Sequence, residues 1–216
     1  MSTLLYVISS PRGEQSESIR IGDEFLRSYL RARPGVQVDR LDLWAEQLPV
    51  YGGKGAAAKM TVFSGQTPTG EEAAAWADVK RVFARFATAD EYLFAVPMWN
   101  AGVPWVLKHL IDTITQPGTV FGFDAASGYI PLLEGKRAIV VYTSGVYSPG
   151  APIEFGTDFH AEFFNDWLRF IGVTDVSEIR FQPTVLTADP DAARNEALAQ
   201  ARELGVKLAA PTAEAA

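Results

Sequence analysis

The sequence of 216 residues contains no cysteine, which excludes disulfide bonds, thiolate metal sites and cysteine nucleophiles. It has only two histidines, His109 and His160, and neither has the spacing of a metal site or a catalytic triad. The motifs HExxH and GxSxG are also missing, so a zinc hydrolase or a serine hydrolase has no support. We therefore expect no bound metal, and we expect both histidines to be structural side chains with satisfied hydrogen bonds.

The sequence also has fewer basic residues than acidic ones. Lysine and arginine number 19 against 26 aspartates and glutamates, which gives a formal net charge of −7. This balance argues against nucleic acid or an anionic membrane surface as a partner. No apolar run approaches the roughly 20 residues needed to cross a bilayer, and the first residues lack the positive segment of a signal peptide. We expect a cytoplasmic protein with neither a membrane partner nor a nucleic-acid partner.

Hydrophobic residues, in contrast, make up 48% of the chain and gather in short runs between amphipathic segments. Runs with the length and composition of strands occur at residues 4–8, 36–41, 92–96, 137–142 and 176–182. Helical patterns occur at residues 19–31, 69–87, 103–116, 155–170 and 190–208. Residues 119–131 predict a small β-hairpin, and residues 42–69 predict a long segment that is functional or partly helical.

Strands that alternate with helices predict an α/β fold, a doubly wound five-stranded parallel sheet with helices on both faces. We expect a single domain over residues 1–210 and a frayed tail over residues 211–216. Sheets of this kind bind ligands at the carboxyl edge of the strands. The loops after the first, third and fourth predicted strands are therefore the candidate site.

The first of these loops reads SSPRGEQSES over residues 9–18. Its hydroxyls at Ser10, Ser16 and Ser18, together with the amides of the helix that follows, are suited to hold a phosphate. The loop lacks the Gly-Lys-Ser/Thr ending of a nucleoside-triphosphate loop, and it has too few glycines for the dinucleotide motif. These two absences favour a monophosphate as the ligand. The alternative is an ordinary serine N-cap followed by a polar turn.

The second loop, PMWNAG over residues 97–102, offers a broad aromatic side chain and an amide, which suits a flat ring with polar edges. Trp99 could instead be a core or interface aromatic. The third loop, residues 144–150 around Tyr147, is by itself typical of a surface turn. A ring-and-phosphate site without an evident acid, base or nucleophile is typical of a cofactor enzyme. A flavin-free interaction domain, whose edge loops bind another protein, is the alternative.

Several stretches together resemble the FMN-dependent NADH-azoreductases, also described as FMN-dependent NADH:quinone oxidoreductases. They are SSPRGEQSES at residues 9–18, PMWN at 97–100, TVFGF at 119–123, LEGKRA at 133–138 and FIGVTD at 170–175. The likeness runs from about residue 3 to residue 208. It implies a flavodoxin-like fold, bound FMN, NADH or NADPH as donor, and a homodimer with active sites at the interface. It also implies ping-pong transfer of two electrons to quinones or azo compounds.

The resemblance also implies roles for individual residues, and none of them is catalytic because the flavin carries the chemistry. The phosphate would be held by Ser10, Ser16, Glu17 and Ser18, and the isoalloxazine would contact Met98, Trp99, Asn100 and Ala101. The pyrimidine edge would be lined by Ser144, Gly145, Val146 and Tyr147. In the substrate pocket, Phe123 of this chain matches a position in the aromatic lid over the flavin, and so does Phe170 of the partner subunit.

Two positions depart from the family pattern. Trp99 stands where tyrosine is common, and residues 144–147 read SGVY where many members have SRGG, so that a cation is absent and Tyr147 narrows the pocket. These changes bear on substrate range and flavin potential. The rival functions are another flavodoxin-like FMN reductase, acting on nitro compounds, chromate or free flavin, and a non-catalytic electron carrier of the flavodoxin type.

Overall fold

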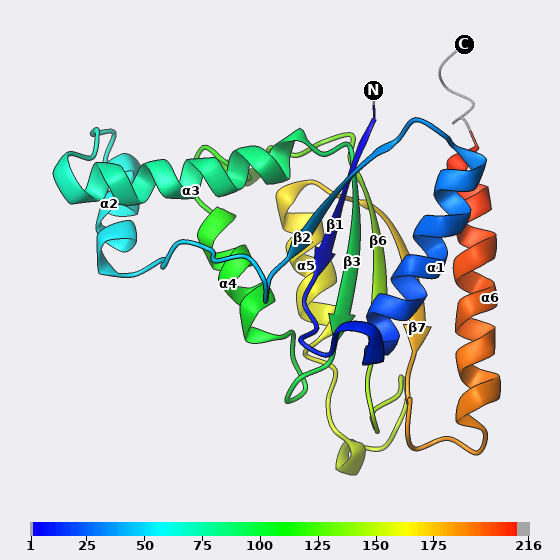
Figure 1. Ribbon diagram of the computed structural model, residues 1–216. Helices are drawn as coiled ribbons and strands as arrows, with labels where there is room; N and C mark the ends of the chain where they lie inside the picture. Colours follow the sequence, from blue (N-terminus) through cyan, green and yellow to red (C-terminus); the bar gives the residue numbers. More distant parts are fainter. Residues whose placement is uncertain (1, 211–216) are drawn as a thin grey trace.

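The computed structural model describes residues 2–210, and the tail expected at residues 211–216 lies outside the described residues. Five parallel strands form the central sheet in the spatial order β2-β1-β3-β6-β7 (Figure 1). They are β1 (Thr3–Ile8), β2 (Gln37–Asp42), β3 (Glu91–Pro97), β6 (Arg137–Thr143) and β7 (Asp175–Phe181). This is the flavodoxin-like strand order, and it confirms the predicted parallel sheet.

Helices cover both faces of the sheet, as predicted. One face carries α1 (Glu17–Ala32) and α6 (Pro190–Ala209), and the other carries α3 (Gly70–Thr88), α4 (Trp105–Ile114) and α5 (Ala161–Ile171) (Figure 1). The central strands β1, β3 and β6 are almost wholly apolar because alternate side chains enter the two cores, Tyr92 and Phe94 on one side and Leu93 on the other. No helix of residues 2–210 has both the length and the apolar character needed to cross a membrane.

Helices α1 and α6 run side by side in the same direction, and a glycine permits their close packing (Figure 1). A Cβ at Gly205 of α6 would lie 2.7 Å from the carbonyl oxygen of Phe25 in α1. Gly22 of α1 has the same role toward the sheet, since a Cβ there would lie 2.5 Å from the hydroxyl of Tyr6 in β1. Real Cβ atoms do not approach so closely. The first turns of both helices lie toward the carboxyl edge of the sheet, because α1 follows β1 and α6 follows β7.

The other elements differ in part from the sequence expectation. The segment 42–69 contains α2 (Gly53–Phe63), so it is partly helical, and α2 and α3 extend beyond the sheet (Figure 1). The predicted hairpin is confirmed as β4 (Phe121–Asp124) and β5 (Gly128–Pro131). The helix predicted from residue 155 begins instead at Ala161, because Gly156 has a φ of 109° and Asp158 Oδ1 accepts from the amides of His160 and Ala161.

Candidate functional site

The loop between β1 and α1 gathers three buried hydroxyls at the start of a helix. Ser10, Ser16 and Ser18 are each at most 4% exposed, and the hydroxyl oxygens of Ser16 and Ser18 lie 3.1 Å apart. Ser16 is also the N-cap of α1, since its side chain accepts from the amide of Ile19. Ser16 therefore does serve as an ordinary N-cap, as the alternative interpretation of this loop expected. That role coexists with a cluster of hydroxyls and helix amides that suits an anion.

Glu17, the fourth residue assigned to the phosphate, directs its carboxylate toward α6. Its Oε1 accepts a hydrogen bond of 2.9 Å from Nε of Arg194. What Glu17 offers to an anion at this helix start is therefore its backbone amide rather than its side chain.

The loop after β3 is a tight turn held in an uncommon conformation. Trp99 and Gly102 exchange backbone hydrogen bonds of 2.8 and 2.9 Å, and the two tip residues, Asn100 and Ala101, have φ values of 49° and 65°. Non-glycine residues in this left-handed region cost about 1 kcal/mol or more each and cluster at functional sites. The amide of Met98 donates to the carbonyl of Thr143 at 2.7 Å, which fixes the turn to the end of β6.

The loop after β6 has its carbonyls turned toward the segment between β7 and α6. The carbonyl of Ser144 accepts from the amide of Thr184 at 2.7 Å, and that of Gly145 accepts from Val185 at 2.9 Å. Because the N–H and C=O of a trans peptide point in opposite directions, the amides of Gly145 and Val146 point away from that segment. These amides are thus free to donate on the other side of the loop.

A cavity of about 210 Å³ lies between the second and third loops. It is lined by Met98, Asn100, Ala101, Ser144, Gly145, Val146, Tyr147, Phe155 and Gly156. The structure therefore brings together the residues that the sequence assigned to the ring and to its pyrimidine edge, apart from Trp99. Phe155 and Gly156 were not predicted for the site, because a helix was expected from residue 155 and the chain instead forms a short 3-10 turn there.

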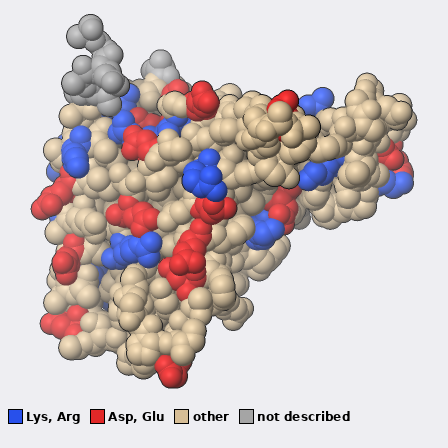
Figure 2. All heavy atoms as spheres, turned by 180° about the vertical axis from the view of Figure 1, so that it is seen from behind, with Lys and Arg blue, Asp and Glu red and all other residues tan. Residues whose placement is uncertain are grey.

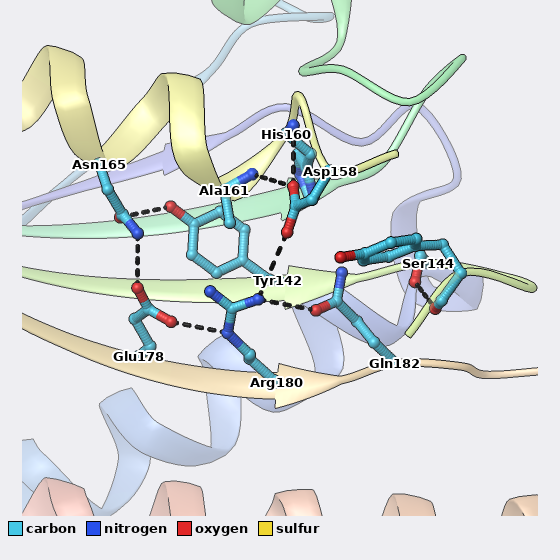
Figure 3. A network of polar contacts seen from close by, with 10 residues as sticks. Tyr142, Ser144, Asp158, His160, Ala161, Asn165, Glu178, Arg180 and Gln182 are labelled. Carbon is cyan, nitrogen blue, oxygen red and sulfur yellow. Dashed lines mark hydrogen bonds and ion pairs between the residues drawn. The ribbon is translucent and has the colours of Figure 1, made fainter. Parts of the chain in front are cut away.

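A polar network lies beneath the third loop and ties β6, β7 and α5 together (Figure 3). Arg180 makes ion pairs with Glu178 at 2.7 Å and Asp158 at 3.7 Å, and its guanidinium lies 5.1 Å from the centre of the Tyr142 ring. Tyr142 donates to Asn165 at 2.8 Å, and burial raises the pKa of its phenol. Arg180 is thus compensated by two carboxylates and supplies no net positive charge.

His160 lies within this network but is not satisfied by it. The side chain is fully buried and meets Tyr142 edge-on, with ring centres 4.9 Å apart. Neither ring nitrogen has a hydrogen-bond partner of good geometry within residues 2–210, although the Val96 carbonyl lies near the ring, so the prediction of a satisfied histidine is wrong here. Burial lowers the pKa of His160 to about 4, against the opposing effects of Asp158 and the Val96 carbonyl. The expectation is confirmed for His109, whose Nε2 lies 3.0 Å from the carbonyl oxygen of Pro49.

Trp99 belongs to a cluster of three tryptophans at the same edge. Trp44, which follows the end of β2, donates from Nε1 to the carbonyl of Ser9 at 3.0 Å. Its ring centre lies 5.7 Å from that of Trp99 and 5.6 Å from that of Trp105. Trp44 was not among the residues predicted for the site, although its place soon after a predicted strand was the signal that could have found it.

A larger cavity of about 920 Å³ continues from Trp99 and Asn100 between α2, α4 and α5. Phe170 lines this larger cavity, whereas Phe123 is 56% exposed on the hairpin. Both phenylalanines contact Tyr129, with ring centres 5.2 and 5.4 Å away. The structure therefore brings the two predicted lid residues together in one chain, outside the smaller cavity.

The opposite edge of the sheet also holds a cavity, of about 990 Å³, beside Arg33, Glu91 and Arg137. It lies at the amino ends of the strands, and its charged side chains are already paired with one another or with the backbone. The carboxyl edge, where the strand ends and helix amides converge, remains the better ligand site. Residues 2–210 hold no cluster of His, Asp and Glu suited to a metal ion. On the face shown in Figure 2, acidic and basic side chains are interspersed.

Known proteins are similar to this chain in sequence or in fold. The family described as having a flavodoxin-like fold matches residues 2–204. A protein of Ruegeria pomeroyi named FMN-dependent NADH:quinone oxidoreductase is 50% identical over 200 residues, which cover 92% of this chain and 98% of that protein. A protein of the same name from Nitratidesulfovibrio vulgaris is 40% identical over 96% of this chain and 100% of its own length. The crystal structure of an azoreductase from Bacillus anthracis aligns with a TM-score of 0.87 at 26% identity, covering 96% of this chain and 100% of its own.

Proposed function

This chain belongs to the family of proteins with a flavodoxin-like fold, and on that premise we propose that it is an FMN-dependent oxidoreductase. It transfers two electrons from NADH to quinones or azo compounds. The observation that carries the proposal is the cavity between the Met98–Ala101 and Ser144–Tyr147 loops, at the sheet edge where the Ser10–Ser18 loop also ends. The names of the relatives, NADH:quinone oxidoreductase and azoreductase, support the same reaction class.

The residues at this edge fit FMN in their chemistry. The buried hydroxyls of Ser16 and Ser18 beside the first amides of α1 suit a monophosphate. The directed amides of Gly145 and Val146 suit the carbonyls and nitrogens of a heterocyclic edge. When bound, FMN accepts a hydride from the nicotinamide and passes two electrons to the acceptor.

The chain itself would bind the flavin and orient it toward the donor and the acceptor. The ends of β3 and β6 fix the two loops through the hydrogen bond from Met98 to Thr143, so the cavity walls are set before a ligand arrives. Trp44 and Trp99, whose ring centres lie 5.7 Å apart at the same sheet edge, would offer an aromatic surface to a ring-shaped donor or acceptor. Because donor and acceptor would use the same face in turn, the proposal includes a ping-pong order, with NADH or NADPH as the donor.

A second copy of the chain completes the proposal. Trp105, Phe123, Tyr129 and Ile130 are between 43% and 61% exposed around the larger cavity and the hairpin. Exposed apolar surface of this kind marks interaction sites. A homodimer would cover it and place two active sites at the interface, where Phe170 of the partner subunit could face the flavin. A cytoplasmic location belongs to the same proposal.

The spectrum of the purified protein tests the proposed function. We expect flavin absorbance that is lost on anaerobic addition of NADH and restored by benzoquinone, together with steady NADH oxidation in the presence of that quinone. A flavin-containing protein with almost no NADH turnover would be an electron carrier, and a protein without flavin would be an interaction domain. Higher kcat/KM for nitro compounds, chromate or free flavin than for quinones would identify a different FMN reductase.

A further inference from the structure

A side-chain pair from opposite ends of the chain meets beside the phosphate loop. Arg194 of α6 donates from Nε to Oε1 of Glu17 at 2.9 Å, although the residues lie 177 positions apart. The two side chains are 23% and 21% exposed, so water screens the pair only partly. The second oxygen of Glu17, Oε2, is buried and has no hydrogen-bond partner within residues 2–210.

The position of Glu17 creates an electrostatic problem for the proposed function. It lies between Ser16 and Ser18, whose hydroxyls are those that would hold the phosphate. A carboxylate next to a phosphate dianion disfavours binding, because like charges repel strongly where water is partly excluded. Asp191, at the start of α6, adds a further carboxylate close by, since it also pairs with Arg194.

We propose that Arg194 is a positioning residue for the phosphate of FMN. Its guanidinium neutralises Glu17 and holds that carboxylate against α6, which leaves the Ser16 and Ser18 hydroxyls and the first amides of α1 for the anion. The inference rests on the proposed FMN-dependent function and concerns how the same site selects a phosphorylated flavin. FMN and riboflavin differ only in the phosphate, so Arg194 should matter for the first ligand and not for the second.

The chain supplies a matched control on the same two helices. Arg202 of α6 makes an ion pair of 3.2 Å with Glu24 of α1, farther along both helices than Glu17 and Arg194. Both arginines therefore join α6 to α1, but only one of them contacts the phosphate loop. If the role of Arg194 were merely to hold the helices together, Arg194→Gln and Arg202→Gln would affect ligand binding alike.

Equilibrium dialysis of the full-length protein against FMN or riboflavin measures the effect. Arg194→Gln is expected to weaken FMN binding about tenfold and to leave riboflavin binding within about twofold, because only the phosphate senses the unpaired carboxylate. The double variant Glu17→Gln, Arg194→Gln should return FMN affinity to within about threefold of wild type. Arg202→Gln should change neither affinity, and thermal unfolding of each variant reports whether it folds.

Equal weakening of FMN and riboflavin by Arg194→Gln, or no weakening of FMN, would overturn the inference. Failure of the double variant to recover FMN binding would overturn it as well. Should Arg194→Gln not fold, Glu17→Gln alone remains decisive: it must bind FMN at least as tightly as wild type, and weaker binding contradicts the inference. Wild-type protein that binds neither flavin would refute the proposed function itself, an outcome distinct from all of these.

Discussion

Replacement of His160 by phenylalanine should make the protein more resistant to acid. The imidazole is fully buried, and the groups that face it are Tyr142 of β6, Arg180 of β7, and Asp158 and the Val96 carbonyl at the ends of neighbouring segments. None of them, the Val96 carbonyl included, makes a hydrogen bond of good geometry to a ring nitrogen within the described chain. Phenylalanine has a similar shape and no polar atoms, so it removes two unsatisfied nitrogens while keeping the contact with Tyr142.

The magnitude follows from the pKa of this histidine. Burial lowers that pKa from 6.5 to about 4, so below pH 6.5 the unfolded chain binds a proton that the folded protein does not. With His160 neutral, the wild-type free energy of unfolding is at its full value above pH 6.5. It decreases as the pH falls from 6.5 toward the folded pKa. Between the two pKa values, each unit by which the pH falls lowers the free energy of unfolding by up to about 1.4 kcal/mol. The loss over the whole interval is roughly 3 kcal/mol.

Urea unfolding followed by tryptophan fluorescence measures this effect, with protein and flavin concentrations held constant. Between about pH 7.5 and pH 5, the difference in unfolding free energy between His160→Phe and wild type should grow by about 2 kcal/mol in favour of the variant. His109 and the carboxylates are present in both proteins, so their titration cancels. Parallel pH profiles for the two proteins would refute the claim that the fold keeps His160 neutral.

Three further substitutions test other parts of the structure. Gly205→Ala should lower the free energy of unfolding by about 2 kcal/mol despite better helix propensity, because its Cβ would lie 2.7 Å from a carbonyl oxygen of α1; urea unfolding measures this. Glu91→Gln should cost about 2 kcal/mol, since the buried carboxylate accepts from Tyr29 at 2.5 Å and from the partly exposed Arg33 at 2.7 Å; the loss should appear as a lower urea midpoint with an unchanged slope. Ser16→Asp should retain the helix cap and thermal stability but bind FMN at least about tenfold more weakly, because it places a like charge beside the phosphate; undiminished flavin content would remove this loop from the site.

The parallel sheet could be predicted because its three central strands, β1, β3 and β6, are short apolar runs buried on both faces, whereas the edge strands β2 and β7 are only partly buried. Residues 92–96, for example, are all fully buried in β3, and a continuous apolar run bounded by polar residues and proline admits few other structures. The right-handed crossover rule then places the helices on both faces. From that arrangement alone, the loops after β1, β3 and β6 fall on one edge, and the candidate site could be located to within a few residues.

The remaining features depend on contacts that no local pattern encodes. The aromatic-rich pattern over residues 155–170 predicts a helix from residue 155, but Gly156 and the cap formed by Asp158 delay its start to Ala161. The missing hydrogen bonds of His160 arise only where β6, β7 and α5 meet. The carboxylate of Glu17 is drawn to Arg194, which lies at the far end of the chain. In each case the partner lies across the fold, so the outcome becomes visible only once the tertiary structure is assembled.

The two departures from the family pattern, at Trp99 and at Tyr147, should affect substrate range more than flavin affinity. The donors proposed for the ring edge are backbone amides, whose directions are set by hydrogen bonds from Thr184 and Val185 to the third loop and from Met98 to Thr143. These bonds do not involve the side chains of Trp99 or Tyr147. Changes at the two side chains alter the walls that a quinone or a nicotinamide would touch, while the backbone that would hold the flavin stays in place. Substrate range should accordingly vary more than flavin affinity when either side chain is replaced.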